Sequence, residues 1–235
     1  MLHNFPITIS EKKTIAENTV EMTFVVSDPL FSFKAGQYVS IEIPALSQAS
    51  VPERCHDFSI VSSPQLPRSI SIVFRISESL FKKAILSLPV GGVVNMSGPK
   101  GVLSLPETTD TPLIFVAGGI GISPLLSMIR HTTETMSSQK IILLYCNSRE
   151  ETSAYLEELA LMAKQNPNFS FHNFLGIPNK ENFYPYLAET QNSLWYVVGA
   201  PAMVELVERI LLESGILDKQ IRIEEFSGYN NGRNK

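Results

Sequence analysis

A glycine-rich turn that follows a buried apolar run is the feature that most limits how this chain can fold. The run 113–117 (LIFVA) leads into a turn at 118–121 (GGIG), after which Ser123 and Pro124 begin a helical pattern. Continuous apolar runs are typical of parallel strands buried on both faces. Glycines permit backbone angles closed to other residues, and the start of a helix favours a phosphate. The spacing differs from the GxGxxG fingerprint, so a turn that binds nothing stays an alternative.

The second half of the chain alternates apolar runs with amphipathic helices. Further strands are predicted at 141–145 (IILLY), 195–198 and 221–226. Three helices are predicted: one capped by Ser123 with Pro124 first, one over about 152–165, and one from Pro201 to a stop at Gly215. This β-α-β progression predicts a doubly wound parallel sheet.

The first half has a different rhythm, in which apolar and polar residues alternate over short stretches. Strands are predicted near residues 7 and 93 and over 19–26, 37–43, 57–62 and 69–76. One helix interrupts them, with a buried stripe of Phe81, Ala84, Ile85 and Leu88. The pattern predicts a six-stranded antiparallel β-barrel. With the change of rhythm near 106–112, we expect two domains, at 1–108 and 109–235.

Charge and cysteine content exclude several classes of protein. The 19 Lys and Arg against 23 Asp and Glu give a net charge of −4, which disfavours nucleic-acid binding. Two isolated cysteines, Cys55 and Cys146, rule out a disulfide scaffold, a cysteine zinc site and a built-in iron–sulfur cluster. No metal site is therefore expected, and Cys146 is expected to be a small buried residue.

One stretch has the length of a membrane span but not the composition of one. Residues 111–129 are uncharged over 19 positions, yet they contain three glycines and two prolines. That composition suits a strand–turn–helix, so no membrane span is expected. The N-terminus has no signal-peptide pattern, and we predict a cytoplasmic protein.

Five segments, in order, resemble motifs of the ferredoxin–NADP(+) reductase-like flavoproteins. They are FKAGQYVSI (33–41), DFSIVSSP (57–64), AGGIGISPLLSMI (117–129), WYVVGAPAMV (195–204) and EEFSGY (224–229). GPKGVLSLP (98–106) also resembles the last turn of the family's barrel. The resemblance implies a flavin in the first domain and a pyridine nucleotide in the second, which share a crevice.

The flavin motif of the family, Arg-x-(Tyr/Phe)-Ser, falls on residues 56–59. The resemblance implies that Phe58 flanks the flavin and that Ser59, followed by Ile60, places its hydroxyl at the reactive N5 edge. His56 stands where the family has arginine and lacks its bidentate fork. As hypotheses, Arg54 or Arg75 takes over that phosphate contact.

The helix at residue 80 supplies a second candidate for the phosphate. Ser79 as helix cap and Lys82 as counter-charge suit an anion. Lys82 and Lys83 are equally well explained as a solvated helix face.

In the second domain, the resemblance assigns the dinucleotide to the glycine turn and to the start of the last helix. The residues implied are Gly118, Gly119, Gly121, Ser123, Gly199, Pro201 and Met203. Met203 also suits the apolar face of its helix. Val198 stands where many relatives have a cysteine that positions the nicotinamide.

Two further segments bear on the nucleotide and on proton transfer. Ser148 and Arg149 favour the 2′-phosphate of NADPH, while Glu150 and Glu151 repel it, so NADH and NADPH both stay open. At the C-terminus, Glu224 is implied to relay protons with Ser59. Phe226 or Tyr229 is implied to lie against the flavin.

These observations predict an NAD(P)H-dependent flavin oxidoreductase with FAD as cofactor, FMN being possible, because no side chain carries electrons itself. The acceptor would be a separate ferredoxin-like protein, a quinone, free flavin or oxygen. The alternatives are a non-catalytic flavin- or nucleotide-binding subunit, which His56 and Val198 favour, and a scaffold protein.

Overall fold

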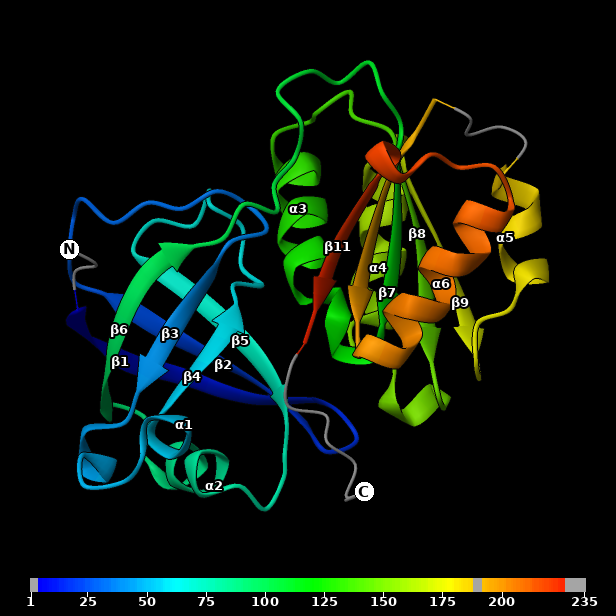
Figure 1. Cartoon of the computed structure of the whole chain (residues 1–235). Coiled ribbons are helices and arrows are strands. Elements are labelled where there is room, and N and C mark those ends of the chain that lie inside the picture. The colour runs from blue at the N-terminus through cyan, green and yellow to red at the C-terminus, as the bar shows by residue number, and fades with distance from the viewer. Residues whose placement is uncertain (1–3, 188–191, 227–235) are drawn as a thin grey trace. The chain divides into compact units, whose positions relative to one another are not determined.

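The computed structural model describes residues 4–187 and 192–226, and these form two compact units. Unit 1 contains the described residues up to 105 together with 123–131. Unit 2 contains 106–122 and the described residues from 132 onward (Figure 1).

Unit 1 is built on a six-stranded antiparallel sheet, as the alternating pattern predicts. Its strands are β1 (Asn4–Ala16), β2 (Thr19–Val26), β3 (Tyr38–Glu42), β4 (Cys55–Ser59), β5 (Ser69–Arg75) and β6 (Val93–Lys100). They follow the order β4-β3-β6-β1-β2-β5. The two outer strands meet just beyond β4, where Ile60 bridges to Ile72 and the Val61 N–H donates to the Ser71 carbonyl at 2.8 Å.

The core of unit 1 contains the inward residues of these strands and the apolar side of α2 (Leu80–Ser87). Phe81 and Ile85 are fully buried, as the predicted helical stripe requires. Ser79 caps the helix, as expected, because its Oγ accepts the Lys82 N–H at 3.3 Å. Figure 1 shows α1 (Val51–Arg54) beside α2, and η1 (Pro44–Leu46) precedes it.

Helix α3 (Ile122–Glu134) corrects one prediction from the sequence. Ser123 is not its cap, because the helix already begins at Ile122, directly after the 3-10 turn η2 (Gly119–Gly121). Gly119, at φ +52°, turns the chain early enough for helical bonding to start before Ser123. Within unit 1, the Ser127 hydroxyl of this helix donates to the Ser62 carbonyl at 2.7 Å.

Unit 2 is built on a five-stranded parallel sheet. Its strands are β7 (Leu113–Gly118), β8 (Ile141–Asn147), β9 (Phe169–Leu175), β10 (Leu194–Gly199) and β11 (Ile221–Glu225). They follow the order β11-β10-β7-β8-β9. The chain proceeds from β7 to β8 and β9 on one side, then returns to the other side of β7 for β10. This reversal confirms the predicted doubly wound topology.

Helices accompany the strands of unit 2. They are α4 (Leu156–Gln165), α5 (Lys180–Leu187) and α6 (Pro201–Glu213), with the short 3-10 turns η3 (Glu150–Thr152) and η4 (Asp218–Gln220). Helix α6 begins at Pro201 and stops before Gly215, at φ +88°, as expected. Helix α4 is shorter than predicted, because η3 ends at Thr152 and Tyr155, at φ +66°, breaks the chain just before the helix. Phe183 of α5 and Val207 of α6 pack with Trp195 into one buried cluster.

Among the described residues, none of the helices is both long and apolar enough to span a bilayer.

Candidate functional site

The carboxyl ends of three neighbouring strands carry the residues predicted to bind a nucleotide. Gly118 ends β7, Asn147 ends β8 and Gly199 ends β10. In doubly wound sheets, ligands bind outside these ends, where the strand order reverses. Here the reversal lies between β7 and β10, so the glycine turn stands at the switch point.

Gly121 is fixed by packing on β10. A Cβ atom at this position would lie 2.7 Å from the Val198 carbonyl carbon and 2.8 Å from the Gly199 Cα, besides striking the Val198 oxygen. Real Cβ atoms essentially never approach backbone so closely. A glycine is therefore required here by the close approach of the turn to the strand.

Met203 lies over the two strand-end glycines. Its ε-methyl carbon lies 2.6 Å from the position of a Cβ on Gly118 and 3.1 Å from that of a Cβ on Gly199. Methionine has a flexible side chain, so this cover can move aside. The space over the glycines fits a ligand that displaces the thioether. The predicted neighbour Pro201 is the first residue of the same helix.

Asn147 is a residue of this edge to which the sequence analysis gave no role. Its amide Nδ2 donates to the Asn173 Oδ1 at 3.0 Å, whereas its own Oδ1 is buried without a hydrogen-bond partner among the described residues. A buried acceptor left unpaired is unfavourable. An oxygen of this kind at the strand ends fits a ligand that brings a donor, as a nucleotide does. In the sequence, only the position of Asn147 beside Ser148 and Arg149 indicated a role in the site.

The segment after β8 is exposed and mixed in charge. Ser148, Arg149, Glu150 and Glu151 all face solvent. The Arg149 carbonyl accepts from the Ser153 hydroxyl at 3.0 Å, which fixes the backbone of the turn. Cys146 just before it is buried, as expected, and burial raises the pKa of its thiol to about 12.

The C-terminal residues predicted for the site lie along β10. Glu224 pairs in register with Val198, and the Phe226 N–H donates to the Gly199 carbonyl at 2.9 Å. Phe226 is thereby joined to the glycine edge of unit 2. Tyr229 lies outside the described residues.

In unit 1, the flavin-motif residues face opposite sides of β4. Phe58 pairs with Val39 and belongs to the core, with 9% of its surface exposed. Ser59 pairs with Tyr38 on the other face and is also buried. Ile60, next in the chain, is fully buried. The structure brings Phe58 together with His56, which lies two residues earlier on the same face.

Aromatic rings gather around His56. Its imidazole stacks on Phe81 with centroids 4.3 Å apart, and Phe81 and Phe74 each lie 5.7 Å from Phe58. His56 Nε2 lies 2.9 Å from the Pro52 carbonyl, which can only accept, so Nε2 carries the proton. Burial chiefly lowers the pKa of His56; the Pro52 bond and Asp57 oppose this, and the positive charge of Lys82 adds to the lowering.

The basic residues predicted near the flavin have different surroundings. Arg54 forms an ion pair with Glu42, in which Nε lies 3.1 Å from Oε1. The Arg54 guanidinium also donates to the Ser47 carbonyl at 3.1 Å. Arg75 follows the core residue Phe74 and so starts on the opposite face of β5. Lys82 is half-buried in the first turn of α2, and burial lowers its pKa. A half-buried ammonium of this kind fits an anionic group.

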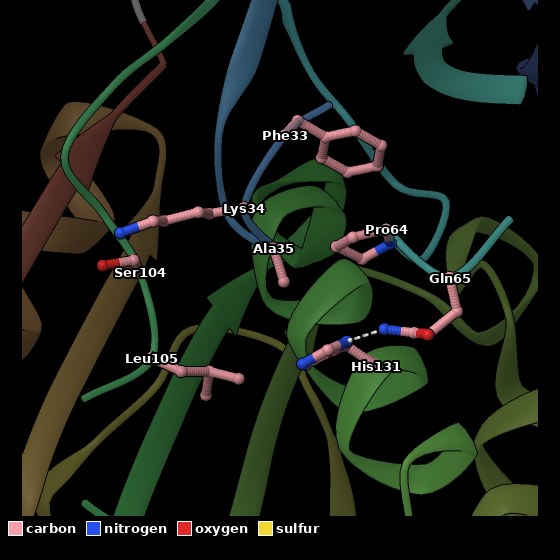
Figure 2. A pocket seen from close by; sticks show the side chains of 8 residues that line it. All are labelled: Phe33, Lys34, Ala35, Pro64, Gln65, Ser104, Leu105 and His131. Atoms are coloured by element: carbon pink, nitrogen blue, oxygen red, sulfur yellow. Dashed lines mark hydrogen bonds between the residues drawn. The ribbon is translucent and has the colours of Figure 1, made fainter. Parts of the chain in front are cut away.

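A separate pocket of about 350 Å³ lies within unit 1 (Figure 2). Figure 2 shows Gln65 hydrogen-bonded to His131, with Lys34 reaching along one side. Its lining residues are Phe33, Lys34, Ala35, Pro64, Gln65, Ser104, Leu105 and His131. None of the residues predicted to bind a cofactor lines this pocket.

Two family models match the chain, one on each side of the predicted domain boundary. Residues 4–102 match a model described as an FAD-binding domain, and residues 115–209 match an oxidoreductase NAD-binding domain. These matches confirm the predicted cofactor classes, FAD with a nicotinamide nucleotide.

Curated relatives are similar over most of the chain. The toluate 1,2-dioxygenase electron transfer component of Pseudomonas putida is 27% identical over 93% of this chain and 66% of its own length. The reductase component of a phenol 2-monooxygenase from Pseudomonas sp. (strain CF600) is 25% identical over 88% of this chain and 62% of its own length. The chain thus spans somewhat less than two thirds of these relatives.

Solved structures show the same fold. Ferredoxin-NADP+ reductase from Plasmodium falciparum superposes with a TM-score of 0.80 at 19% identity, covering 95% of this chain and 96% of that one. The cytochrome P450 reductase from Amycolatopsis gives a TM-score of 0.81 at 21% identity, covering 96% and 71%. At such identities the likeness shows the fold alone.

The packing of the glycine turn predicts a difference between two substitutions. Gly121→Ala should destabilise the protein by about 1–3 kcal/mol, because the new Cβ meets backbone that cannot yield. Gly118→Ala should cost less than about 1 kcal/mol, because only the end of Met203 must move. Thermal and urea unfolding of both variants would measure this. Equal losses would contradict the packing described for Gly121.

The surroundings of His56 predict a shift in its titration. Lys82→Met should raise the pKa of His56, because a positive charge that opposes protonation of the imidazole is removed. Imidazole signals followed by NMR against pH would show it. Lys83→Met is the matched control, since Lys83 is exposed and paired with Glu78. An unchanged pKa of His56 in the Lys82→Met variant would show that the two side chains do not interact.

Proposed function

Because the chain belongs to the ferredoxin–NADP(+) reductase-like flavoproteins, we propose that it is an NAD(P)H-dependent flavoprotein oxidoreductase that delivers electrons to a separate acceptor. The observation that carries the proposal is the presence of both matches in one chain, FAD-binding over 4–102 and oxidoreductase NAD-binding over 115–209. The gap between them supports a domain boundary at 108/109.

The pyridine nucleotide is assigned to the strand ends of unit 2. Gly118 and Gly119 let its phosphates approach the backbone, and the unpaired Asn147 Oδ1 accepts from one of its donors. Met203 moves off Gly118 and Gly199 when the nucleotide enters. Gly121 and Ser123 hold the turn and the first turn of α3 that shape this edge.

The flavin is assigned to unit 1. A bound FAD supplies the acceptance of hydride from NAD(P)H and the release of electrons. Phe58, which keeps 9% of its surface exposed, gives the aromatic contact that the resemblance implies, while His56 and Lys82 meet negative charge. The Ser59 hydroxyl, which both donates and accepts, holds a proton at its Oγ for the N5 edge.

Two residues of β11 and its end complete the assignment. By the resemblance, the Glu224 carboxylate would take up or return a proton, and Phe226 would lie against the flavin. This part rests on the resemblance of residues 224–229 to the family's C-terminal motif and on the bond from Phe226 to Gly199.

A separate redox protein is the acceptor we favour. Relatives are named as the electron transfer component of a dioxygenase and the reductase component of a monooxygenase. A quinone or free flavin are the other acceptors. The cytoplasmic location predicted from the sequence stays a prediction.

A second candidate function is the binding of flavin without catalysis. It is favoured by the burial of Phe58, which leaves little of its ring exposed.

Anaerobic titration of the purified protein, loaded with FAD, tests the function. NADH should bleach the visible flavin absorbance at one equivalent, because one hydride reduces one flavin. Ser59→Ala should slow the bleaching while FAD stays bound. A flavoprotein that neither NADH nor NADPH reduces would support binding without catalysis, and a chain that takes up no flavin would contradict both candidate functions.

The charges after β8 predict a preference for NADH. Arg149 stands beside two exposed glutamates, so the turn repels a 2′-phosphate overall. We expect kcat/KM for NADH to exceed that for NADPH by at least about threefold. The double variant Glu150→Gln with Glu151→Gln should raise kcat/KM for NADPH about threefold and keep kcat/KM for NADH within about twofold of the wild-type value. A wild-type preference for NADPH would overturn this assignment.

A further inference from the structure

We propose that the pocket of unit 1 in Figure 2 is a binding site for a small aromatic carboxylate, with the Lys34 ammonium as the partner of its charged group. None of the residues assigned to the flavin or the nucleotide lines this pocket, so the inference goes beyond the proposed function and does not depend on it. The size of the pocket, the fixed backbone of its walls and the chemistry of its side chains carry the proposal.

The pocket has the size of a small-molecule site. Its volume is about 350 Å³, at the lower end of the range of about 300–1,000 Å³ typical of such sites. All of its lining residues belong to unit 1, and they come from segments that are far apart in the sequence. These segments are 33–35 before β3, 64–65 after β4, 104–105 after β6, and His131 of α3. Side chains from separate parts of the chain therefore converge on one space.

Hydrogen bonds fix the turn that carries Lys34. The Lys34 N–H donates to Gln37 Oε1 at 2.8 Å, and the Lys34 carbonyl accepts the Gln37 N–H at 3.1 Å. The Gln37 side-chain amide donates to the Gly101 carbonyl at 3.2 Å. Gly36, at φ +98°, approaches the Leu103 carbonyl so closely that a Cβ would lie 2.5 Å from its oxygen. This wall of the pocket is thus joined to the chain that forms the next wall.

A second turn and α3 position Gln65 and His131. The Gln65 N–H donates to Ser63 Oγ at 3.2 Å, and the Leu66 N–H donates to the Ser63 carbonyl at 3.2 Å. The Gln65 Nε2 lies 3.4 Å from His131 Nδ1, which accepts its proton (Figure 2). These walls are positioned before any ligand binds, which lowers the entropy cost of binding.

The apolar part of the pocket suits a flat ring. It is formed by Phe33, Ala35, Pro64 and Leu105. The Phe33 ring centroid lies 6.1 Å from that of Phe31, and both rings pack against the core of unit 1. Because Phe33 is held in this way and Pro64 has a rigid ring, the pocket offers fixed faces for an aromatic body.

The charge of the ligand follows from Lys34. Lys34 is exposed along one side of the pocket, and none of the ion pairs found among the described residues uses its ammonium. None of the eight lining residues, all within the described part of the chain, carries a carboxylate. An anionic group on the ligand therefore meets positive and no negative charge in the lining. One ammonium balances one negative charge, which favours a carboxylate over a phosphate dianion.

Cinnamate and its neutral counterpart cinnamamide, which has nearly the same shape, test the proposal. Kd for each is measured by NMR titration of the full chain loaded with FAD, at one fixed ionic strength. Wild type should bind cinnamate at least about threefold more tightly than cinnamamide. Lys34→Met should abolish this difference, because the charge partner is lost, and should keep Kd for cinnamamide within about twofold.

Two further variants locate the site. Gln65→Glu adds a negative charge to the lining and should weaken cinnamate at least about threefold, with Kd for cinnamamide changed by less than about twofold. Lys13→Met removes an exposed lysine of β1 outside the pocket and should leave both Kd values unchanged. The imidazole signals of His131 should shift during the titration, whereas those of His172 in unit 2 should not.

Equal Kd values for cinnamate and cinnamamide in wild type, or an unchanged ratio of the two in Lys34→Met, would overturn the proposal. Displacement of cinnamate by NADH, or loss of its binding once FAD is loaded, would also overturn it, because the ligand would then occupy a cofactor site. A chain that takes up no FAD is titrated as purified. The pocket is thereby tested even where the proposed function fails, and the reduction of flavin by NADH is measured separately.

Discussion

The close approach of the glycine turn to β10 is the constraint on which the nucleotide edge of unit 2 depends. With no side chain at Gly121, the turn contacts the backbone of Val198 and Gly199, which brings the ends of β7 and β10 together. The same approach places Gly118 and Gly199 under Met203. The turn glycines thus serve two purposes: Gly121 allows the strands to pack, and Gly118 leaves room that a flexible side chain covers.

This division of roles shows what could be predicted from the sequence. Spacing identified the buried strand, the turn and α6, because glycine and proline act locally on the backbone. It placed the start of α3 wrongly at Ser123, since the φ of +52° at Gly119 and the 3-10 turn depend on packing against β10. The edge strand β9 was not predicted, because all its side chains except Phe169 are half-exposed or exposed and give a weak pattern.

The candidate flavin site shows the same limit more sharply. Two adjacent lysines are equivalent in the sequence, and only the fold separates them, because a helix turns about 100° between neighbours. Lys83 meets Glu78 in solvent, while Lys82 is half-buried. Likewise, the sequence offers Arg54 for a phosphate, whereas in the fold Arg54 pairs with Glu42. The ion pair between Glu42 of β3 and Arg54 at the end of α1 is a tertiary contact that no local pattern carries.

The unpaired groups on both units follow one physical principle. Lys82 lacks a counter-charge among the described residues of unit 1, and the Asn147 Oδ1 lacks a donor among those of unit 2. Each of these unpaired groups lowers the stability of the protein without ligand, whereas a well-packed apolar residue in the same place would not. A ligand that binds only the folded chain offsets such losses, contributing about 2.7 kcal/mol at a hundred times its Kd. Under the proposed function, a nucleotide bound at the strand ends of unit 2 would offset the cost of the unpaired Asn147 Oδ1 in this way.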